Sequence, residues 1–480
     1  MAHRIIIAAG LTLGMAVTAT ADRGGPYSVE EKLTASDAAE DDSFGSSVAI
    51  SGTTAVVGAR HEDDGGSSSG SVYVYQQLGD GTWGEIQKLT ASDAAELDYF
   101  GTSVAISGDW ILIGANEDDD NDSDSGSAYL FQRQGDGTWS EIQKLIASDG
   151  ATKDRFGQSV AISGETAIIG AWKDDDNGSN SGSAYLFQQQ DDGSWAEVQK
   201  LTASDGTGGE YFGWSVSISG EQALVGAYYD DSDAAEACGS AYLFERQDDE
   251  TWVEQQKLVA SDSADNDFFG MSVSVSADAA VVGVPYDDDV GSGSGSAYVF
   301  QRQDDDTWSE TQKLTATDTE NFGDSVAIFD DMILIGSTLA GNDGVYSGAA
   351  FLYQRQADDS WVEFRMLTPS DGETSDNFGE RVAISAGTAL IASINDDDHG
   401  TSSGSAYIYT SPTPAGTGAC CVHTGCDILT REQCVNLGGE YLDGTLCDEC
   451  DPLCLADINA NGIVGVGDLL EVIDTWGPCP

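Results

Sequence analysis

Residues 88–142, KLTASDAAELDYFGTSVAISGDWILIGANEDDDNDSDSGSAYLFQRQGDGTWSEI, contain a pattern that recurs along most of this 480-residue chain. Internal repetition at a fixed period is the strongest indicator of a repeat architecture. The Phe-Gly dipeptide of the pattern returns at intervals of 56, 56, 56, 57, 53 and 56 residues, at Phe44, Phe100, Phe156, Phe212, Phe269, Phe322 and Phe378. The chain therefore carries seven copies of one structural unit.

Each unit contains four short segments with the composition of β-strands. In the first unit these are Ser47–Ser51, Thr54–Gly58, Ser71–Gln76 and Trp83–Leu89. Their residues alternate between apolar and polar, or are rich in β-branched and aromatic types. Ser-Gly and Asp-Gly pairs mark the turns. No segment has an apolar stripe at helical spacing over ten residues. Seven units of four antiparallel strands predict an all-β, seven-bladed propeller, which protects its sheet edges by closing radially. A β-solenoid is the alternative, but its rungs are shorter than 56 residues.

The two ends of the repeat region predict how the ring closes. The seventh unit runs from Phe378 through Tyr407-Ile408-Tyr409 and stops at Pro412, without a tryptophan strand. The missing piece matches Ser28–Leu33 at the start of the region. We therefore expect an N-terminal strand to complete the last blade. The periodic residues of the Phe44 and Trp83 types are expected to pack between blades.

At these residues the chain resembles the FG-GAP repeat family, the blade type of integrin alpha-subunit propellers, in its bacterial secreted form. The resemblance covers residues 28–411 and implies an extracellular binding or adhesion role. The Gly-Ala-Pro part of the FG-GAP motif is matched less closely, as in Gly283-Val284-Pro285 and Ala392-Ser393-Ile394. Integrin calcium loops of the Asp-x-Asp-x-Asp-Gly type lie between the first and second strands. Here that turn has only two or three residues, such as Ser107-Gly108-Asp109, so the family's calcium sites are not expected.

Charge and the N-terminus predict the compartment. Asp and Glu number 83 against 19 Lys and Arg, a formal net charge of −64. This balance argues against nucleic acid and anionic membranes as partners. Residues 1–21 have the pattern of a secretory signal peptide, with Arg4, an apolar run over 5–17 and Ala19-Thr20-Ala21. A membrane anchor is the alternative, but the run is shorter than the roughly 20 residues that a bilayer requires. We expect a secreted, extracellular or cell-surface protein without membrane insertion.

The acidic residues should gather on one face of the propeller. In an antiparallel blade, the loop entering the first strand and the loop between the second and third strands leave on the same side, and both are acidic in every unit. Two interpretations are open: a solvated, salt-adapted surface, or cation binding by hard oxygen ligands. The best candidate for Ca²⁺ on this face is the alternating set Asp120, Asp122 and Asp124, which precedes Gly126.

The C-terminal region differs in composition from the repeats. Residues 412–419 are a linker by composition, residues 420–455 form a cysteine-rich module, and residues 456–480 follow. Cys238 is alone within the repeats, whereas eight cysteines crowd the tail: Cys420, Cys421, Cys426, Cys434, Cys447, Cys450, Cys454 and Cys479. In an oxidising compartment this density predicts disulfides. A zinc site at Cys447 and Cys450 is the alternative.

The last segment has the spacing of a 12-residue EF-hand loop. Side-chain oxygens stand at positions 1, 3, 5 and 12, a backbone carbonyl at position 7, and Gly462 makes the turn. The predicted Ca²⁺ ligands are Asp457, Asn459, Asn461, Ile463 and Asp468. The segment resembles half of a dockerin module, which implies a cohesin-like or cell-envelope partner and a sorting or anchoring role. A single repeat and the two Asn ligands put ordinary cohesin docking in doubt. A metal-free loop pinned by Cys454 and Cys479 is the alternative.

No catalytic constellation is recognisable. The mature chain has three histidines, His61, His399 and His423, and none stands beside a motif serine or cysteine. Propellers host enzymes too, so the fold alone decides nothing. We expect a non-catalytic binding module for an extracellular glycan or protein. A surface-layer component that gathers divalent cations and a polysaccharide-active enzyme are the alternatives. Trp110, Trp172 and Trp214 depart from the repeat and are the first candidates for a carbohydrate platform.

Overall fold

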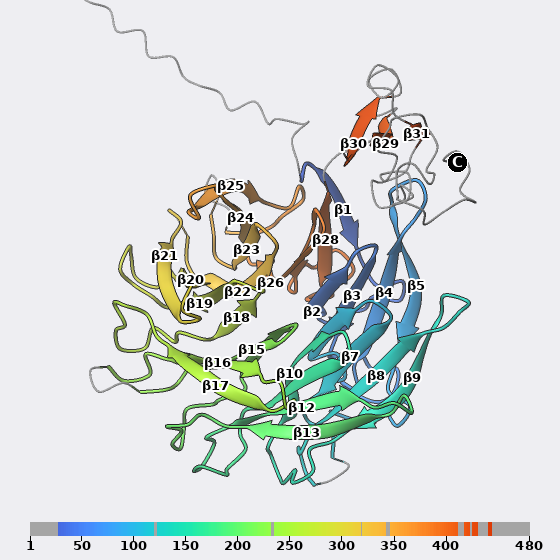
Figure 1. The fold of residues 1–480 in the computed structure, drawn as a ribbon. Helices are drawn as coiled ribbons and strands as arrows, with labels where there is room; N and C mark the ends of the chain where they lie inside the picture. Colours follow the sequence, from blue (N-terminus) through green and yellow to red (C-terminus); the bar gives the residue numbers. More distant parts are fainter. Residues whose placement is uncertain are drawn as a thin grey trace, which may run out of the picture. The chain divides into compact units, whose positions relative to one another are not determined.

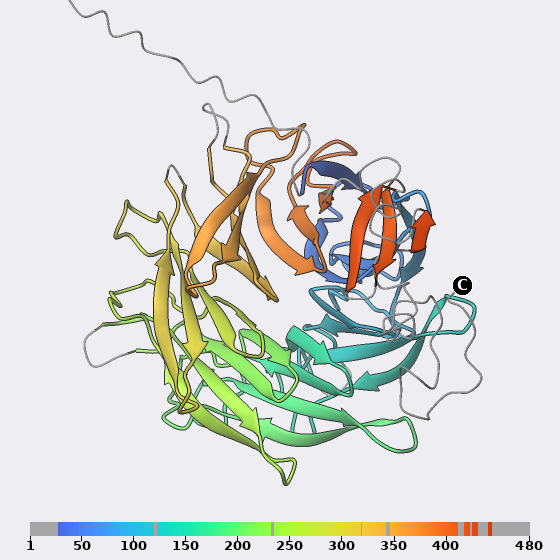
Figure 2. The ribbon, with the colours of Figure 1, turned by 45° about the horizontal axis from the view of Figure 1, so that its top comes forward.

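Each repeat folds into a four-stranded antiparallel sheet, and seven such sheets form the blades of a propeller, as predicted (Figure 1). The computed structural model describes residues 27–119, 122–231, 235–317, 319–341 and 346–410, and the backbone of residues 417–422, 425–430 and 440–443. Blades 1 to 6 are β2–β5, β6–β9, β10–β13, β14–β17, β18–β21 and β22–β25, and blade 7 is β26–β28 completed by β1. Seen from a second angle, the blades follow one another around a common centre (Figure 2).

The strands keep the same bounds from blade to blade. The first, innermost strands are β2 (Phe44–Ser51), β6 (Ser103–Ser107), β10 (Phe156–Ser163), β14 (Ser215–Ser219), β18 (Ser272–Val275), β22 (Phe322–Phe329) and β26 (Phe378–Ser385). The second strands are β3 (Thr54–Ala59), β7 (Trp110–Ala115), β11 (Thr166–Ala171), β15 (Gln222–Ala227), β19 (Ala279–Val284), β23 (Met332–Ser337) and β27 (Thr388–Ser393). The third strands are β4 (Ser71–Gln77), β8 (Ser127–Arg133), β12 (Ser183–Gln189), β16 (Ser240–Arg246), β20 (Ser296–Arg302), β24 (Ala349–Arg355) and β28 (Ser405–Thr410). The outer strands are β5 (Trp83–Leu89), β9 (Trp139–Leu145), β13 (Trp195–Leu201), β17 (Trp252–Leu258), β21 (Trp308–Leu314), β25 (Trp361–Leu367) and β1 (Val29–Leu33).

Burial along a blade follows the sequence pattern. All six residues of β3 are buried, which matches their uninterrupted run of small and β-branched residues, whereas β5 is buried only at its two ends. The first strand of blade 1 begins at Phe44, three residues earlier than predicted, because a bulge between Phe44 and Ser47 extends the pairing. The turns between first and second strands have two or three residues. They are too short for the Asp-x-Asp-x-Asp-Gly loop, as predicted.

Blades are held together by seven hydrophobic clusters, each shared by two consecutive blades. The Phe of each Phe-Gly pair is fully buried at such a junction; Phe156, for example, packs edge-to-face on Tyr185 at 5.4 Å. One cluster joins Leu390 and Ile408 of blade 7 to Phe44 of blade 1. Seven blades in an open stack would make six junctions, so the seventh cluster demonstrates ring closure.

The closing strand is the one that the sequence predicts. β1 pairs antiparallel with β28 over its whole length, from Val29 opposite Thr410 to Leu33 opposite Ala406. These strands lie side by side although they come from opposite ends of the repeat region (Figure 1). Tyr27, just before β1, stands where other outer strands begin with Trp, and it is buried.

Close backbone contact between blades explains the repeated Ser-Gly motif. Gly404 of blade 7 forms a bridge with Phe44 of blade 1 and has a φ of 79°. A Cβ at this position would lie 2.0 Å from the carbonyl oxygen of Phe44. Only glycine tolerates both the left-handed backbone and this approach.

The repeated Gln of the outer strand fastens one blade to the next at five of the seven junctions. The side-chain amide of Gln87 in blade 1 donates to the carbonyl of Trp139 in blade 2 at 2.7 Å and accepts from its N–H at 2.7 Å. Both backbone groups of an exposed sheet edge are thereby satisfied. The same pair of bonds recurs at Gln143 with Trp195, Gln199 with Trp252, Gln256 with Trp308, and Gln312 with Trp361.

The tail is a second unit, and its described part is a small antiparallel sheet of β29 (Thr417–Val422), β30 (Gly425–Thr430) and β31 (Glu440–Asp443), in the order β30-β29-β31. This sheet was not predicted, and β29 begins inside the predicted linker 412–419. The predicted signal peptide 1–21 and calcium loop 457–468 lie outside the described residues. No helix with the length and hydropathy of a membrane span is found among the residues that the structure describes.

Candidate functional site

The long loops leave the propeller on one face, which we call the loop face. They are the loops that enter each first strand and those that join the second and third strands, and the antiparallel strand order sends both to the same side. The turns on the opposite side are short. The loop face carries the acidic segments singled out in the sequence.

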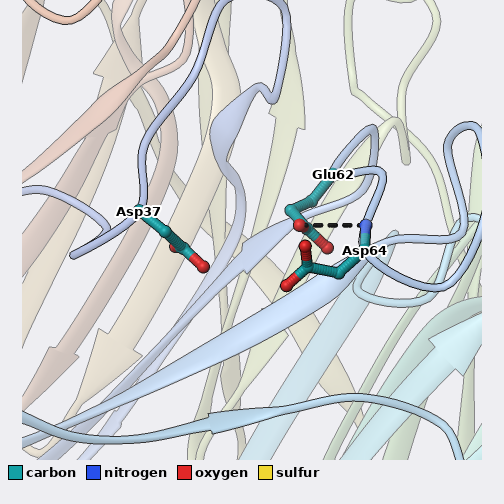
Figure 3. Close-up of side chains that lie close together, drawn as sticks. All are labelled: Asp37, Glu62 and Asp64. Atoms are coloured by element: carbon teal, nitrogen blue, oxygen red, sulfur yellow. Dashed lines mark hydrogen bonds between the residues drawn. The ribbon is translucent and has the colours of Figure 1, made fainter.

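Carboxylates on the loop face gather around lysines of the outer strands, and we call each such group a carboxylate–lysine cluster. In blade 3, Lys200 Nζ lies 2.8, 2.9 and 2.5 Å from carboxylate oxygens of Asp149, Asp174 and Asp176. The side chain of Asp174 is only 4 % exposed, and the Tyr185 hydroxyl donates to it at 2.9 Å. Figure 3 shows the three carboxylates of the equivalent group in blade 1, Asp37, Glu62 and Asp64.

Lys200 and Asp149 of this cluster both remain charged. Burial by itself would lower the pKa of Lys200, but the bonds to its three carboxylates outweigh burial and raise that pKa. Burial would likewise raise the pKa of Asp149, yet the bonds from Lys200 and Tyr185 lower it. The Lys200 ammonium and the Asp149 carboxylate therefore stabilise each other's ionised forms.

Six of the seven blades contain a carboxylate–lysine cluster. The lysines and their printed carboxylate partners are Lys32 with Asp371, Asp396 and Asp398; Lys88 with Asp37, Glu62 and Asp64; Lys144 with Asp93 and Asp118; Lys200 with Asp149, Asp174 and Asp176; Lys257 with Asp205 and Asp230; and Lys313 with Asp262, Asp287 and Asp289. In blades 1 and 3 the carboxylate oxygens lie within 4.8 Å of one another, close enough to share a metal ion. In both, the lysine ammonium already lies among them.

Blade 6 lacks the cluster, and its substitutions occur together. Met366 replaces the lysine, Ala340 the buried carboxylate, Phe351 the tyrosine and Ala349 the serine that bonds the carboxylate elsewhere. A cavity of about 20 Å³ lies among these apolar side chains. The buried part of the cluster is thus replaced as one unit, whereas Asp318, which matches Asp149 in the sequence, lies outside the described residues.

Two of the predicted calcium ligands on this face, Asp122 and Asp124, make other contacts. Asp122 accepts a hydrogen bond from the N–H of Ser123 at 2.8 Å, and the carboxylate of Asp124 lies 3.9 Å from Arg155. Asp120 lies outside the described residues. The carboxylate groups close enough to share an ion, among the residues described, are those of blades 1 and 3. Calcium at Asp120, Asp122 and Asp124 stays a prediction.

A cavity of about 260 Å³ occupies the central channel at its loop-face end. It is lined by the residues that begin the first strands of the blades. Most are Ser and Val of the repeat, but Arg60, Trp214, Met271, Asp324 and Arg381 also line it. These five were not predicted as a group, because they come from five different blades and depart from the repeat.

Packed aromatic rings extend from Trp214, which lines this cavity, and we call the group the aromatic wall: Trp172, Tyr211, Trp214, Tyr228, Tyr229, Phe268 and Tyr286. Trp172 and Trp214 meet edge-to-face at 5.0 Å, and Tyr229 stacks on Phe268 at 5.2 Å. Tyr229 and Tyr286 keep 42 % and 44 % of their surface exposed. Rings on blades 3, 4 and 5 thus present an apolar surface beside the channel.

Two of the three tryptophans proposed as a carbohydrate platform belong to this wall. Trp110 does not, because it begins β7 at the opposite end of blade 2, where it packs on Trp195 at 5.4 Å. Trp172 follows a second strand and Trp214 precedes a first strand, so both lie at the loop-face end.

The arginines Arg60 and Arg381 line the same cavity. Neither has a carboxylate within 4 Å in the described part of the chain, although Arg381 donates to the backbone carbonyl of Glu380 at 2.8 Å. The Nε of Arg60 is buried without a hydrogen-bond partner. Burial, and then the positive charge of Arg381, lower the pKa of Arg60.

The mouth is also where the seven repeats differ most. The Phe of the Phe-Gly pair and the Leu that ends the outer strand are identical in all seven units. By contrast, the residue after Phe-Gly differs in every unit: Ser46, Thr102, Gln158, Trp214, Met271, Asp324 and Glu380. The residue after the second strand also differs in every unit: Arg60, Asn116, Trp172, Tyr228, Pro285, Thr338 and Ile394.

Comparison with known families agrees with this architecture. The FG-GAP repeat family matches seven stretches of the chain, at residues 27–75, 83–131, 139–187, 195–244, 252–300, 308–353 and 361–409. A search of curated proteins returned no match. Each matched stretch runs from the outer strand of one blade through the first three strands of the next. The seven stretches cover more than half of the sequence, so the chain belongs to the FG-GAP repeat family.

Proposed function

We propose that this protein is a non-catalytic, extracellular binding module of the adhesion type, and that its ligand binds at the mouth of the central channel on the loop face. The observation that carries the proposal is the aromatic wall beside a cavity of about 260 Å³. Apolar walls with a few convergent polar groups are typical of ligand pockets in folded proteins.

The variability of the mouth supports this location. Positions that pack between blades repeat because the packing dictates them, whereas surface positions are free to differ. Residues that differ for lack of constraint would share the acidic, polar character of this chain's surface. Four of the differing positions instead carry Arg60, Trp172, Trp214 and Tyr228, residue types that dominate binding hot spots.

A non-catalytic role is favoured by the composition of the cavity. Among the described residues that line it, Asp324 is the one carboxylate, and there is no lysine, histidine or cysteine. Hydrolysis of glycosides generally uses two carboxylates, and nucleophilic catalysis uses a base beside the nucleophile.

The proposal includes secretion through residues 1–21 and attachment or sorting through the tail. Calcium at Asp457, Asn459, Asn461, Ile463 and Asp468 would order the dockerin-like segment for a cohesin-like or cell-envelope partner. The twelve-residue spacing in the sequence supports this part of the proposal.

A glycan array probed with the full-length, calcium-loaded protein tests the binding role. Tyr229→Ala and Tyr286→Ala should lose most of the array signal, because both rings are exposed in the wall. Tyr346→Ala is the matched control, since Tyr346 is 52 % exposed and lies outside the wall. Retained binding in both wall variants would contradict the proposed location, and turnover of a bound glycan would contradict the non-catalytic role.

A further inference from the structure

The charge at the channel mouth is opposite to that of the chain as a whole. Only 19 of 480 residues are Lys or Arg, and six lysines are held in carboxylate–lysine clusters. Two arginines nevertheless line one small cavity without an ion-pair partner in the described part of the propeller. Arg381 is exposed, but Arg60 is partly buried with an unpartnered Nε beside a second positive charge, which is unfavourable for folding. A ligand that supplies the missing anion would remove that cost.

The acidic groups near these arginines do not neutralise them. Asp324 lines the cavity and attracts Arg381, but it accepts a hydrogen bond from the Thr338 hydroxyl at 2.9 Å, and burial outweighs both effects and raises its pKa. Attraction to Glu380 raises the pKa of Arg60, but burial and the positive charge of Arg381 each lower that pKa by more. The guanidinium groups therefore remain available to an incoming anion.

Arginine is suited to carboxylates because its planar fork matches their two oxygens. The opposite side of the mouth offers exposed ring faces of the aromatic wall. Few small groups combine an anion with an apolar face of matching size, and a pyranose ring that bears a carboxylate is one of them. The cavity of about 260 Å³ is just below the range of drug-sized pockets, about 300–1,000 Å³, and so suits one such ring.

The rest of the loop face opposes a longer anionic chain. Carboxylates with more than half of the side chain exposed surround the mouth on this face: Asp64, Asp176, Asp289 and Asp398. At physiological ionic strength, charges repel over a Debye length of about 8 Å. A polyanion lying across the face would pass these groups, whereas the end of a chain entering the mouth would not.

From these observations we infer that the ligand is a glycan with a single acidic sugar at its end, whose carboxylate binds Arg60 and Arg381 while its ring packs against the aromatic wall. This inference rests on the proposed function and specifies the ligand class of the same site. It predicts selection for a terminal uronic acid over a neutral sugar and over an extended polyuronate.

Titration calorimetry on the full-length protein with free glucuronate, with glucose and with polygalacturonate tests the inference. Wild type should bind glucuronate at least tenfold more tightly than glucose, because glucose lacks the carboxylate and cannot make the charge-assisted hydrogen bonds to the arginines. It should also bind glucuronate more tightly than polygalacturonate, per sugar unit. Arg60→Gln and Arg381→Gln should each weaken glucuronate binding about tenfold.

Thermal unfolding of the same variants separates a binding role from a structural one. Removing one of two unpaired, mutually repelling guanidinium groups should leave the midpoint unchanged or raise it. Lys153→Gln is the matched control, because it makes the same charge change at an exposed position outside the cavity lining. It should alter neither affinity nor midpoint.

Equal binding of glucose and glucuronate, or unchanged affinity in both arginine variants, would overturn the inference. If neutral glycans bind through Tyr229 while glucuronate does not, the ligand class is wrong and the proposed binding role stands. If no glycan of any charge binds the wild-type protein, both fail. Tighter binding of polygalacturonate would overturn the end-on mode.

Discussion

Replacing Lys200 by Met in blade 3 isolates what the carboxylate–lysine cluster contributes to stability. The substitution leaves three carboxylates without their ammonium, and Asp174 among them is 4 % exposed at its side chain. Breaking a buried ion pair by removing one partner costs about 3–5 kcal/mol. Because Asp176 is 58 % exposed and Lys200 is 18 % exposed, we expect the lower end of that range, about 3 kcal/mol.

Blade 6 provides the natural compensation. Its apolar set can be transferred to blade 3 by adding Asp174→Ala, Ser183→Ala and Tyr185→Phe to Lys200→Met, which mirrors Ala340, Ala349, Phe351 and Met366. A buried carboxylate and its hydroxyl donors then disappear together with the ammonium, and the carboxylates that lose a partner, Asp149 and Asp176, are exposed to solvent. The fourfold variant should be more stable than Lys200→Met alone, although it carries more substitutions.

Denaturant titration of the full-length protein, followed by circular dichroism, compares the variants through their midpoints. Calcium provides a second readout, since the carboxylate oxygens of Asp149, Asp174 and Asp176 lie within 4.8 Å of one another. Added Ca²⁺ should raise the midpoint of Lys200→Ala more than that of wild type. A Lys200→Met protein as stable as wild type, or a fourfold variant less stable than Lys200→Met, would refute the account of the cluster as one unit.

Three other predictions concern separate parts of the chain. Burial raises the pKa of Asp98 and of Asp154 to about 6, so the folded state holds protons that the unfolded state has lost between about pH 4 and pH 6. Stability should therefore fall as the pH rises through that window, and Asp98→Asn with Asp154→Asn should flatten the slope of midpoint against pH; an unchanged slope would contradict it. Cys238→Ser should leave the free energy of unfolding within about 0.5 kcal/mol of wild type. The reason is that Cys238 stands where other blades have Ser and contacts the equivalent loop carbonyl, and a larger change would refute this equivalence. In the tail, Asp457→Ala with Asp468→Ala should abolish one calcium site by calorimetry, and unchanged stoichiometry would place the ion elsewhere.

Much of the propeller could be predicted because its determinants are local and repeated. A strand pattern of period two, turn residues at fixed offsets and seven copies of one unit specify the blade and its number without knowledge of distant contacts. The closing strand was predictable for the same reason, since residues 28–33 match the other outer strands. The bulge at Phe44 and the burial of Tyr27 at the Trp position were not predicted. Neither a pairing irregularity nor a Tyr in place of Trp leaves a periodic signal in the sequence.

The candidate site was predictable only in part. The face that carries the acidic loops follows from strand direction, and Trp172 and Trp214 were noticed because they depart from the repeat. The lysine of each cluster carried a signal that was missed, its recurrence in six of seven outer strands.

The sequence by itself determined the fold class, the number of blades and the strand that closes the ring, since each follows from short-range pattern and repetition. The tertiary structure alone decided which side chains meet across the ring: Lys32 with Asp371, 339 residues away, and Arg60 with Arg381 in one cavity. Such contacts depend on closure, which brings the first and last blades together. No periodicity along the chain encodes a distance through space.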